Sequence, residues 1–154
     1  MQSGFLYNQL SDFKKKLLTE VADLFPKETD KFLTDNAKDF KKDVQKVAKK
    51  EVKAHSLHTR WDKKKQKDVS TNYHKNFKVG KKYSRDNARC IRVYNSARHA
   101  HLIENGHVLY SHGKSVGFVP GRFVIKIAET DFKTKFLDNT EKFLYQFFDK
   151  TTEQ

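Results

Sequence analysis

The chain has 154 residues, of which 36% are hydrophobic, and a formal net charge of +13. This length provides one modest core in a single domain, and its 13 Phe and 6 Tyr predict a core dominated by phenylalanine. The one cysteine, Cys90, excludes an intrachain disulfide, and no apolar run approaches the ~18–20 residues of a membrane span. We therefore expect a soluble protein, made in a reducing cytoplasm, with no membrane contact.

The excess positive charge lies in one third of the chain. Residues 38–92 contain 19 Lys or Arg and 6 Asp or Glu, a net +13, whereas residues 1–37 sum to −1 and residues 93–154 to +1. A local positive field attracts a polyanion or an acidic protein face. The charge indicates the sign of a partner and leaves its identity open.

Two helices are predicted at the N-terminus. An apolar pattern with steps of three and four residues marks the first helix, residues 1–26, and Pro26 is predicted to end it. The second helix, residues 29–54, has an apolar face that includes Ala37, Phe40, Val44 and Val52. Its opposite face carries Lys38, Lys41, Lys42, Lys46, Lys49, Lys50 and Lys53. We interpret this lysine face as the solvated side of an amphipathic helix.

Residues 56–76 show no periodicity and are predicted to form a long lysine-rich loop, either mobile or functional. Trp61 and Tyr73 flank a cluster of lysines in this segment. The cluster consists of Lys63, Lys64, Lys65 and Lys67. Because lysines bind phosphates while aromatic rings stack on bases, Trp61 and these lysines are candidate contacts for DNA or an acidic partner. A solvated lysine loop fits the same residues equally well.

Residues 77–119 are predicted to form an antiparallel sheet of about four strands. The first two strands, 76–83 and 88–95, flank a turn, and Gly80 marks either a bulge or a turn. A short element ends at the Asn105-Gly106 turn, and two more strands follow, at 108–110 and 116–119.

The last predicted element is a C-terminal helix, residues 121–149. Strands grouped between helices favour the α+β class. The expected fold is an antiparallel sheet packed against the long basic amphipathic helix and the C-terminal helix, with an extra N-terminal helix.

The sequence contains no motif for catalysis, a cofactor or a metal. His99, His101, Glu104 and His107 match no spacing with known ligand geometry, and neither GxGxxG nor GxxxxGK[ST] occurs. We therefore predict no enzyme activity, no cofactor and no metal site.

The segments 95–107 and 117–122, followed by a helix, resemble the tail-completion, or head–tail joining, family of long-tailed bacteriophage neck proteins. The positions that carry the resemblance are His99, Ala100, Glu104, Gly106, His107, Pro120, Gly121 and Arg122. The chain departs from the family pattern where the lysine-rich 56–76 segment replaces a proline- and glycine-containing turn.

The resemblance implies a virion structural protein without catalysis. It would complete the tail and join it to the head connector as a hexameric ring in the neck. Its implied partners are the head connector or stopper ring, and the tail terminator or tail tube. The motif residues would then be structural, with Gly106 and Gly121 permitting unusual backbone angles and Arg122 forming an ion pair with Glu104.

Two alternatives remain open from the sequence. A nucleic-acid-binding protein or small basic ribonuclease would explain the charge and the histidines. A tail terminator shares the size and the α+β class. Loss of nuclease activity on changing His99, His101 or His107 would favour the ribonuclease.

Overall fold

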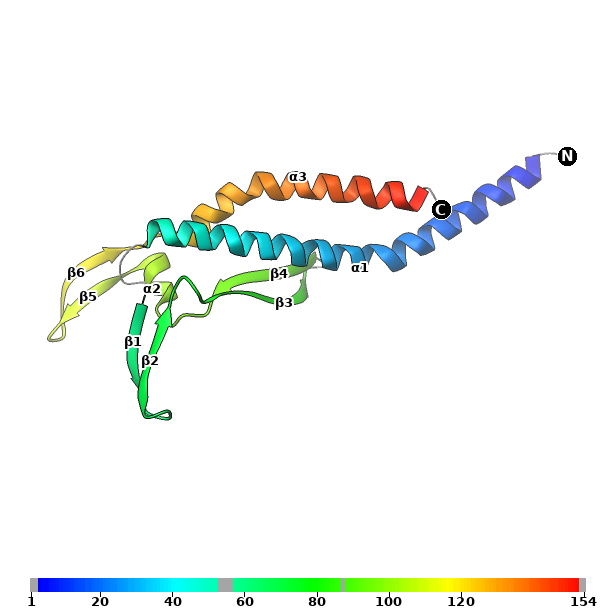
Figure 1. Ribbon diagram of the computed structural model, residues 1–154. Helices are drawn as coiled ribbons and strands as arrows, with labels where there is room; N and C mark the ends of the chain where they lie inside the picture. The colour runs from blue at the N-terminus through cyan, green and yellow to red at the C-terminus, as the bar shows by residue number, and fades with distance from the viewer. Residues whose placement is uncertain (1–2, 53–56, 87, 153–154) are drawn as a thin grey trace.

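A computed structural model of the chain describes residues 3–52, 57–86 and 88–152. Its elements, in order, are α1 (Ser3–Glu51), β1 (Leu57–Asp62), β2 (Lys67–Asn72), β3 (Phe77–Arg85), β4 (Ala88–Asn95), α2 (Ala100–Asn105), β5 (Gly106–Ser111), β6 (Lys114–Pro120) and α3 (Val124–Thr152). The two long helices lie side by side, and three hairpins project from them or lie along α1 (Figure 1). The predicted α+β class is confirmed.

Pro26 lies inside α1, so the predicted break between two N-terminal helices is wrong. A proline removes one helical hydrogen bond and commonly bends the axis, and α1 changes direction in its N-terminal half (Figure 1). The helix continues because aromatic packing on α3 holds the segment around Pro26. The ring centroids of Phe25 and Phe147 are 5.1 Å apart, and those of Phe32 and Phe143 are 4.6 Å apart.

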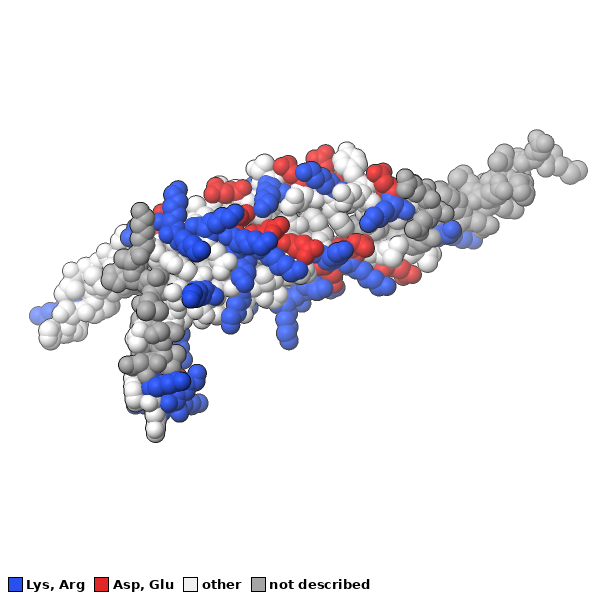
Figure 2. All heavy atoms as spheres, viewed as in Figure 1, with Lys and Arg blue, Asp and Glu red and all other residues white. Residues whose placement is uncertain are grey.

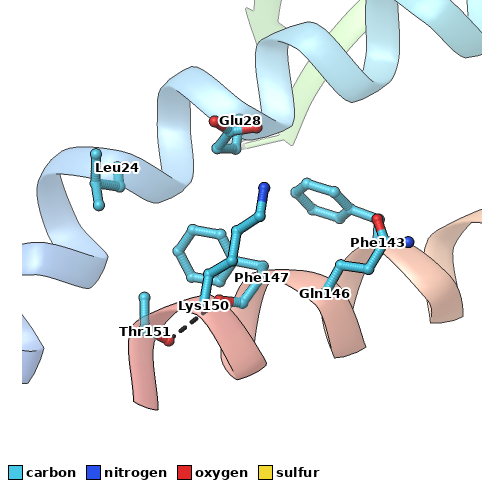
Figure 3. Close-up of a pocket in the computed structure, with 7 residues that line it drawn as sticks. All are labelled: Leu24, Glu28, Phe143, Gln146, Phe147, Lys150 and Thr151. Atoms are coloured by element: carbon cyan, nitrogen blue, oxygen red, sulfur yellow. Dashed lines mark hydrogen bonds between the residues drawn. The ribbon is translucent and has the colours of Figure 1, made fainter. Parts of the chain in front are cut away.

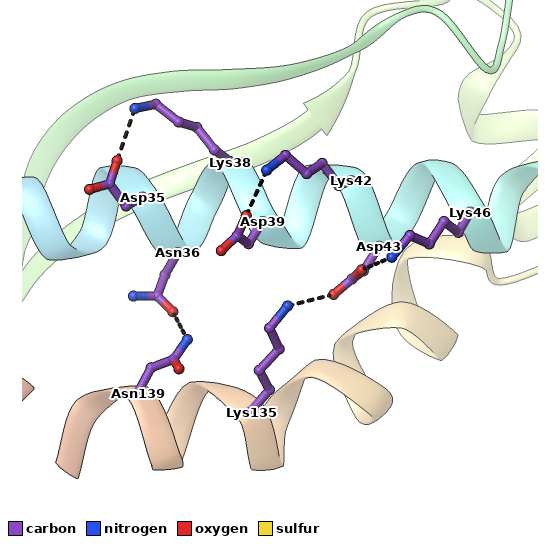
Figure 4. Close-up of polar contacts among 9 residues, drawn as sticks. All are labelled: Asp35, Asn36, Lys38, Asp39, Lys42, Asp43, Lys46, Lys135 and Asn139. Carbon is purple, nitrogen blue, oxygen red and sulfur yellow. Dashed lines mark hydrogen bonds and ion pairs between the residues drawn. The ribbon is translucent and has the colours of Figure 1, made fainter. Parts of the chain in front are cut away.

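The helices α1 and α3 run antiparallel, with phenylalanines along their seam. The ring of Phe40 extends the seam by packing 5.2 Å from that of Phe132. A polar contact also crosses it, since Asn139 donates a hydrogen bond of 2.7 Å to the side-chain oxygen of Asn36 (Figure 4). The predicted dominance of phenylalanine therefore holds for this helix pair. Among the described residues, no helix is long and apolar enough to cross a membrane.

A second part of the core lies where the C-terminal half of α1 meets the hairpins, and it is built mainly from valine and alanine. Its largest members are the fully buried Tyr73 and Phe77. The predicted apolar face of the basic helix is confirmed here, because Val44, Ala48 and Val52 are all buried in this cluster.

The segment predicted as a long loop is a β-hairpin instead. Strands β1 and β2 pair antiparallel from Leu57 opposite Asn72 to Asp62 opposite Lys67, while residue 56 lies outside the described residues. The physical reason is local: Thr59, Trp61 and Thr71 favour extended backbone, and Asp62 organises the turn. Its Oδ1 accepts hydrogen bonds from the amides of Lys64 and Lys65.

The other four strands form the two predicted hairpins. Strands β3 and β4 pair with a register shift between Val79 and Lys82, which confirms the bulge at Gly80. Strands β5 and β6 pair from Gly106 opposite Pro120 to Ser111 opposite Lys114. The described strands form three separate two-stranded sheets, so the four strands expected in one sheet are divided between two hairpins.

Candidate functional site

The residues that carry the family resemblance, here called the motif residues, meet at one corner of the molecule, where α2 runs into β5 and β6 leads to α3. His99 precedes α2 and Glu104 lies within it. Gly106 and His107 open β5 and pair with Pro120 and Val119 at the end of β6. The remaining motif residues, Gly121 and Arg122, connect β6 to α3. Residues separated by up to 23 positions in the sequence thus share one place in the fold.

The carboxylate of Glu104 ties three segments together. The Tyr73 hydroxyl donates a hydrogen bond of 2.5 Å to its Oε1, and the amide of Ile125 donates one of 3.2 Å to its Oε2. Ile125 lies in the first turn of α3, where a carboxylate satisfies amides that have no helical partner. Burial, reinforced by the bond to Glu104, raises the pKa of the Tyr73 phenol far above its ordinary value, so this hydroxyl stays a neutral donor.

The expected ion pair between Arg122 and Glu104 is wrong. Among the described residues Arg122 forms no ion pair with this carboxylate, whose two oxygens are used by Tyr73 and Ile125. Arg122 contributes through its backbone, since its amide donates a hydrogen bond of 2.7 Å to the carbonyl of Ile103. The reason is geometric: the residue continues the chain out of β6, and its side chain is exposed.

Backbone packs directly on backbone at this corner. A Cβ atom at Gly121 would meet the carbonyl oxygen of Glu104 and lie 2.7 Å from the carbonyl carbon of Asn105. Gly106 has φ +77°, and a Cβ there would meet the carbonyl oxygen of Val119. Both glycines are therefore needed for the close approach of the α2–β5 and β6–α3 connections.

His99 of the motif and the nearby His101 lie in different environments. His99 is 8% exposed, with its ring centroid 6.3 Å from that of Tyr73, while His101 is exposed on α2. Over the described ranges, no group of three His, Cys, Asp or Glu side chains could hold a metal ion.

The β1–β2 hairpin carries the predicted basic cluster at its tip. Lys63, Lys64, Lys65 and Lys67 are exposed, and Trp61 beside them is 58% exposed. Figure 2 shows Lys and Arg side chains gathered at this tip, away from the helices. Within the described part of the chain, these four lysines form no ion pair. The structure thus places the cluster on a projecting arm.

The lysines of α1 are in a different electrostatic setting. Lys38, Lys42 and Lys46 each pair with an aspartate three residues earlier, at 2.9–3.0 Å (Figure 4). Lys135 of α3 also reaches Asp43, at 3.3 Å. Such pairs offset charge on the helix surface and add little stability. These ion pairs distinguish the three lysines of α1 from the lysines of the β1–β2 tip.

The β5–β6 ribbon, residues 106–120, exposes an apolar surface that sequence reasoning missed. Tyr110 is 71% exposed, Val116 62% and Phe118 61%. Val108 lies opposite Phe118 and two residues before Tyr110, so these three side chains share one face. The signal in the sequence was the lack of any Asp, Glu, Lys or Arg from residue 105 to residue 113.

A shallow cavity opens between the middle of α1 and the C-terminal end of α3 (Figure 3). It is lined by Leu24, Glu28, Phe143, Gln146, Phe147, Lys150 and Thr151. The Thr151 hydroxyl donates to the carbonyls of Phe147 and Phe148, which leaves it poorly placed as a nucleophile. This lining contains one carboxylate and one amine, and no group that would activate a substrate.

The exposed apolar β5–β6 ribbon and the basic β1–β2 tip offer surfaces for contact with other macromolecules. The model of the HK97-gp10-like family, described as "Bacteriophage HK97-gp10, putative tail-component", matches residues 11–106. The match covers more than half of the 154 residues, and the chain belongs to this family. It is a bacteriophage tail component and hence a virion protein. The matched region ends at Gly106, so β6, α3 and the Pro120–Arg122 motif lie beyond it.

The family match agrees with the resemblance drawn from the motif residues. No curated protein matches the chain. No solved structure matches it either.

Proposed function

We propose that this protein is a structural component of the phage neck, which completes the tail and joins it to the head connector as a hexameric ring. The observation that carries the proposal is the exposed apolar β5–β6 ribbon on a chain of a tail-component family. A two-stranded ribbon is marginally stable alone in water, and large exposed apolar patches mark contact sites. The ribbon is therefore suited to burial against another virion protein.

The proposed partners are the head connector or stopper ring on one side and the tail terminator or tail tube on the other. In this role the protein acts through its surfaces rather than through catalysis. The motif corner keeps the β1–β2 and β5–β6 hairpins in a fixed orientation. Glu104 in α2, next to β5, is bonded to the first turn of α3 and to Tyr73, which follows β2.

Inactivation of the gene in the phage tests the proposal. We expect filled heads and tails of normal length to accumulate unjoined, as seen by electron microscopy, and purified protein added to the extract to restore joining. Tails of irregular length would instead identify a tail terminator. Normal infectious particles would contradict both roles.

The basic β1–β2 tip is expected to contact DNA independently of sequence, in keeping with a ring whose lumen passes DNA. Replacing Lys63, Lys64, Lys65 and Lys67 with glutamine should weaken binding to duplex DNA. It should also reduce the slope of log K against log salt, by up to about 0.9 for each phosphate that the variant no longer neutralises. Fluorescence anisotropy over a range of salt concentrations measures both effects.

A matched control replaces Lys38, Lys42 and Lys46, which are paired with aspartates on α1, and should change the slope much less. Salt-insensitive DNA binding, or saturable binding to an isolated acidic connector with none to DNA, would assign the tip to a protein partner.

A further inference from the structure

The helix α3 carries a second exposed apolar surface, on the side facing away from α1. We call it the outer stripe; its large apolar residues are Ile127, Leu137, Leu144, Tyr145 and Phe148 of α3 and Phe123 just before the helix, with exposed fractions from 37% to 66%. Their spacing places them on one face of a helix. Val124, Ala128 and Phe132, which are buried, occupy the other face. The helix is thus apolar on two sides, and α1 covers one of them.

The outer stripe and the β5–β6 ribbon do not meet within one copy. Figure 1 shows the ribbon projecting past the beginning of α3 and away from that helix. The stripe extends from Phe123 to Phe148, about 37 Å at 1.5 Å per residue, toward the opposite end of the molecule. One chain therefore exposes two different apolar surfaces in two different places.

We infer that the β5–β6 ribbon of one copy packs on the outer stripe of α3 in the next copy around the ring. The inference rests on the proposed ring, and it names the two surfaces that build it. A closed ring needs a heterologous interface, in which each subunit contributes two different patches to its two neighbours. The ribbon and the stripe are such a pair.

The chemistry of the two surfaces favours a second copy as the occupant. The ribbon carries one formally charged residue, Lys114 at its turn. The centre line of the stripe also carries one, Glu141, between Leu137 and Leu144. The remaining positions on that line are apolar or threonine, namely Phe123, Ile127, Thr130, Thr134 and Phe148. Lys126 borders the stripe at its beginning, beside Phe123 and Ile127. The two surfaces are therefore mainly apolar, and Glu141 on the stripe is opposite in sign to Lys114 on the ribbon.

The shape of the stripe supports the same pairing. A hollow lined by Phe123, Lys126, Ile127 and Thr130 opens at its beginning and could receive an aromatic side chain. Aromatic anchors seated in such hollows carry much of the affinity of protein interfaces. The ribbon offers Tyr110 and Phe118, both more than 60% exposed.

The area of the ribbon shows that it needs support from a second contact. Its two aromatic side chains offer roughly 250 Å² of exposed surface, whereas each partner in a stable interface buries about 800 Å². The β1–β2 arm projects from the same end of the molecule (Figure 1), and exposed Asp131 and Asp138 lie beside the stripe. The positively charged lysines at the β1–β2 tip of one copy are therefore suited to contact these carboxylates in the next copy.

Mixing two variants tests the pairing of ribbon and stripe. Tyr110→Asp disables the ribbon, and Tyr145→Asp, at 66% exposure, disables the stripe. Leu18→Asp is the control, because Leu18 is 59% exposed on α1. Because all three side chains are exposed, we expect unchanged circular dichroism and Tm.

Sedimentation velocity on the full chain should show self-association of the wild type and of Leu18→Asp. Each of the other two variants should sediment as a monomer. A mixture of Tyr110→Asp and Tyr145→Asp should form a dimer and nothing larger, because one intact ribbon meets one intact stripe. That result would support a heterologous interface.

The inference is overturned if either variant alone self-associates like the wild type, or if the mixture forms no dimer. Self-association by both variants would leave the neck function standing and place the interface elsewhere. A wild type that stays monomeric at every concentration would also overturn the inference. The gene-inactivation experiment then decides separately whether the neck function falls with it.

Discussion

Replacing Gly121 with alanine should lower the free energy of unfolding by about 3 kcal/mol, a large part of the ~5–15 kcal/mol that holds a typical domain folded. The added Cβ would overlap the carbonyl oxygen of Glu104 and lie 2.9 Å from the amide nitrogen of Gly106. These are backbone atoms held by hydrogen bonds, since the carbonyl of Glu104 accepts from the amide of Phe123 and Gly106 pairs with Pro120. They cannot move aside as a flexible side chain would. The midpoint of urea-induced unfolding measures the effect.

Gly117 supplies the matched control for this substitution. It lies in the same strand as Pro120, and a Cβ there would find its nearest neighbour at 3.9 Å, in the side chain of Leu109. Gly117→Ala should therefore change the free energy of unfolding by no more than about 0.5 kcal/mol. Equal midpoints for the two variants would show that the corner tolerates a side chain.

Replacing Glu104 with alanine is expected to cost about 3 kcal/mol of folding free energy. The change leaves the buried Tyr73 hydroxyl without its acceptor, which costs about 1–3 kcal/mol. It also removes the carboxylate that accepts from the amide of Ile125 at the start of α3, a loss of about 0.5–2 kcal/mol. Glu104→Gln should cost less, because its amide oxygen still accepts one of the two hydrogen bonds. Urea unfolding compares the two variants.

Arg122→Ala is the control that separates the observed contacts from the ion pair predicted from sequence. Because Arg122 acts through its backbone amide, truncating its exposed side chain should change the free energy of unfolding by about 0.5 kcal/mol or less.

A double-mutant cycle between Tyr73→Phe and Glu104→Gln should give a clear coupling energy, because the two side chains share a hydrogen bond. If Arg122→Ala lowered the free energy of unfolding as much as Glu104→Ala, the ion pair predicted from the sequence would be supported instead.

Local signals were sufficient for most of the secondary structure. The three- and four-residue steps of α1 and α3, the bulge at Gly80 and the β3–β4 pairing all depend on neighbouring residues, and the structure places these elements close to the predicted ranges. Strand β3 continues through Arg85, into the range predicted as a turn, and residue 87 lies outside the described residues. Strands β1 and β2 were missed because lysines hide a weak alternation of β-favouring residues around Trp61. A lysine-rich segment can still form a hairpin when both of its strands contain β-favouring residues and the residues between them favour a turn.

Long-range contacts account for the remaining errors. Pro26 stays inside a helix because Phe25 packs on Phe147, a partner about 120 residues away that no local pattern indicates. Glu104 has Tyr73 as its partner, 31 residues earlier, so the nearer Arg122 was the wrong choice. The outer stripe of α3 could be recognised only once the face covered by α1 was known.

The pairing of α1 with α3 also sets the order in which the chain can fold during synthesis. The described hairpins join residues close in sequence, and such local contacts form early. The bond between Asn36 and Asn139 spans 103 residues, which at ~5–20 residues per second is a delay of about 5–20 s on the ribosome. During that interval the phenylalanine face of α1 stays exposed on the nascent chain, because α3 has not yet been synthesised. The helix pair therefore forms after the hairpins during synthesis, and the interval before it forms exposes the chain most to aggregation.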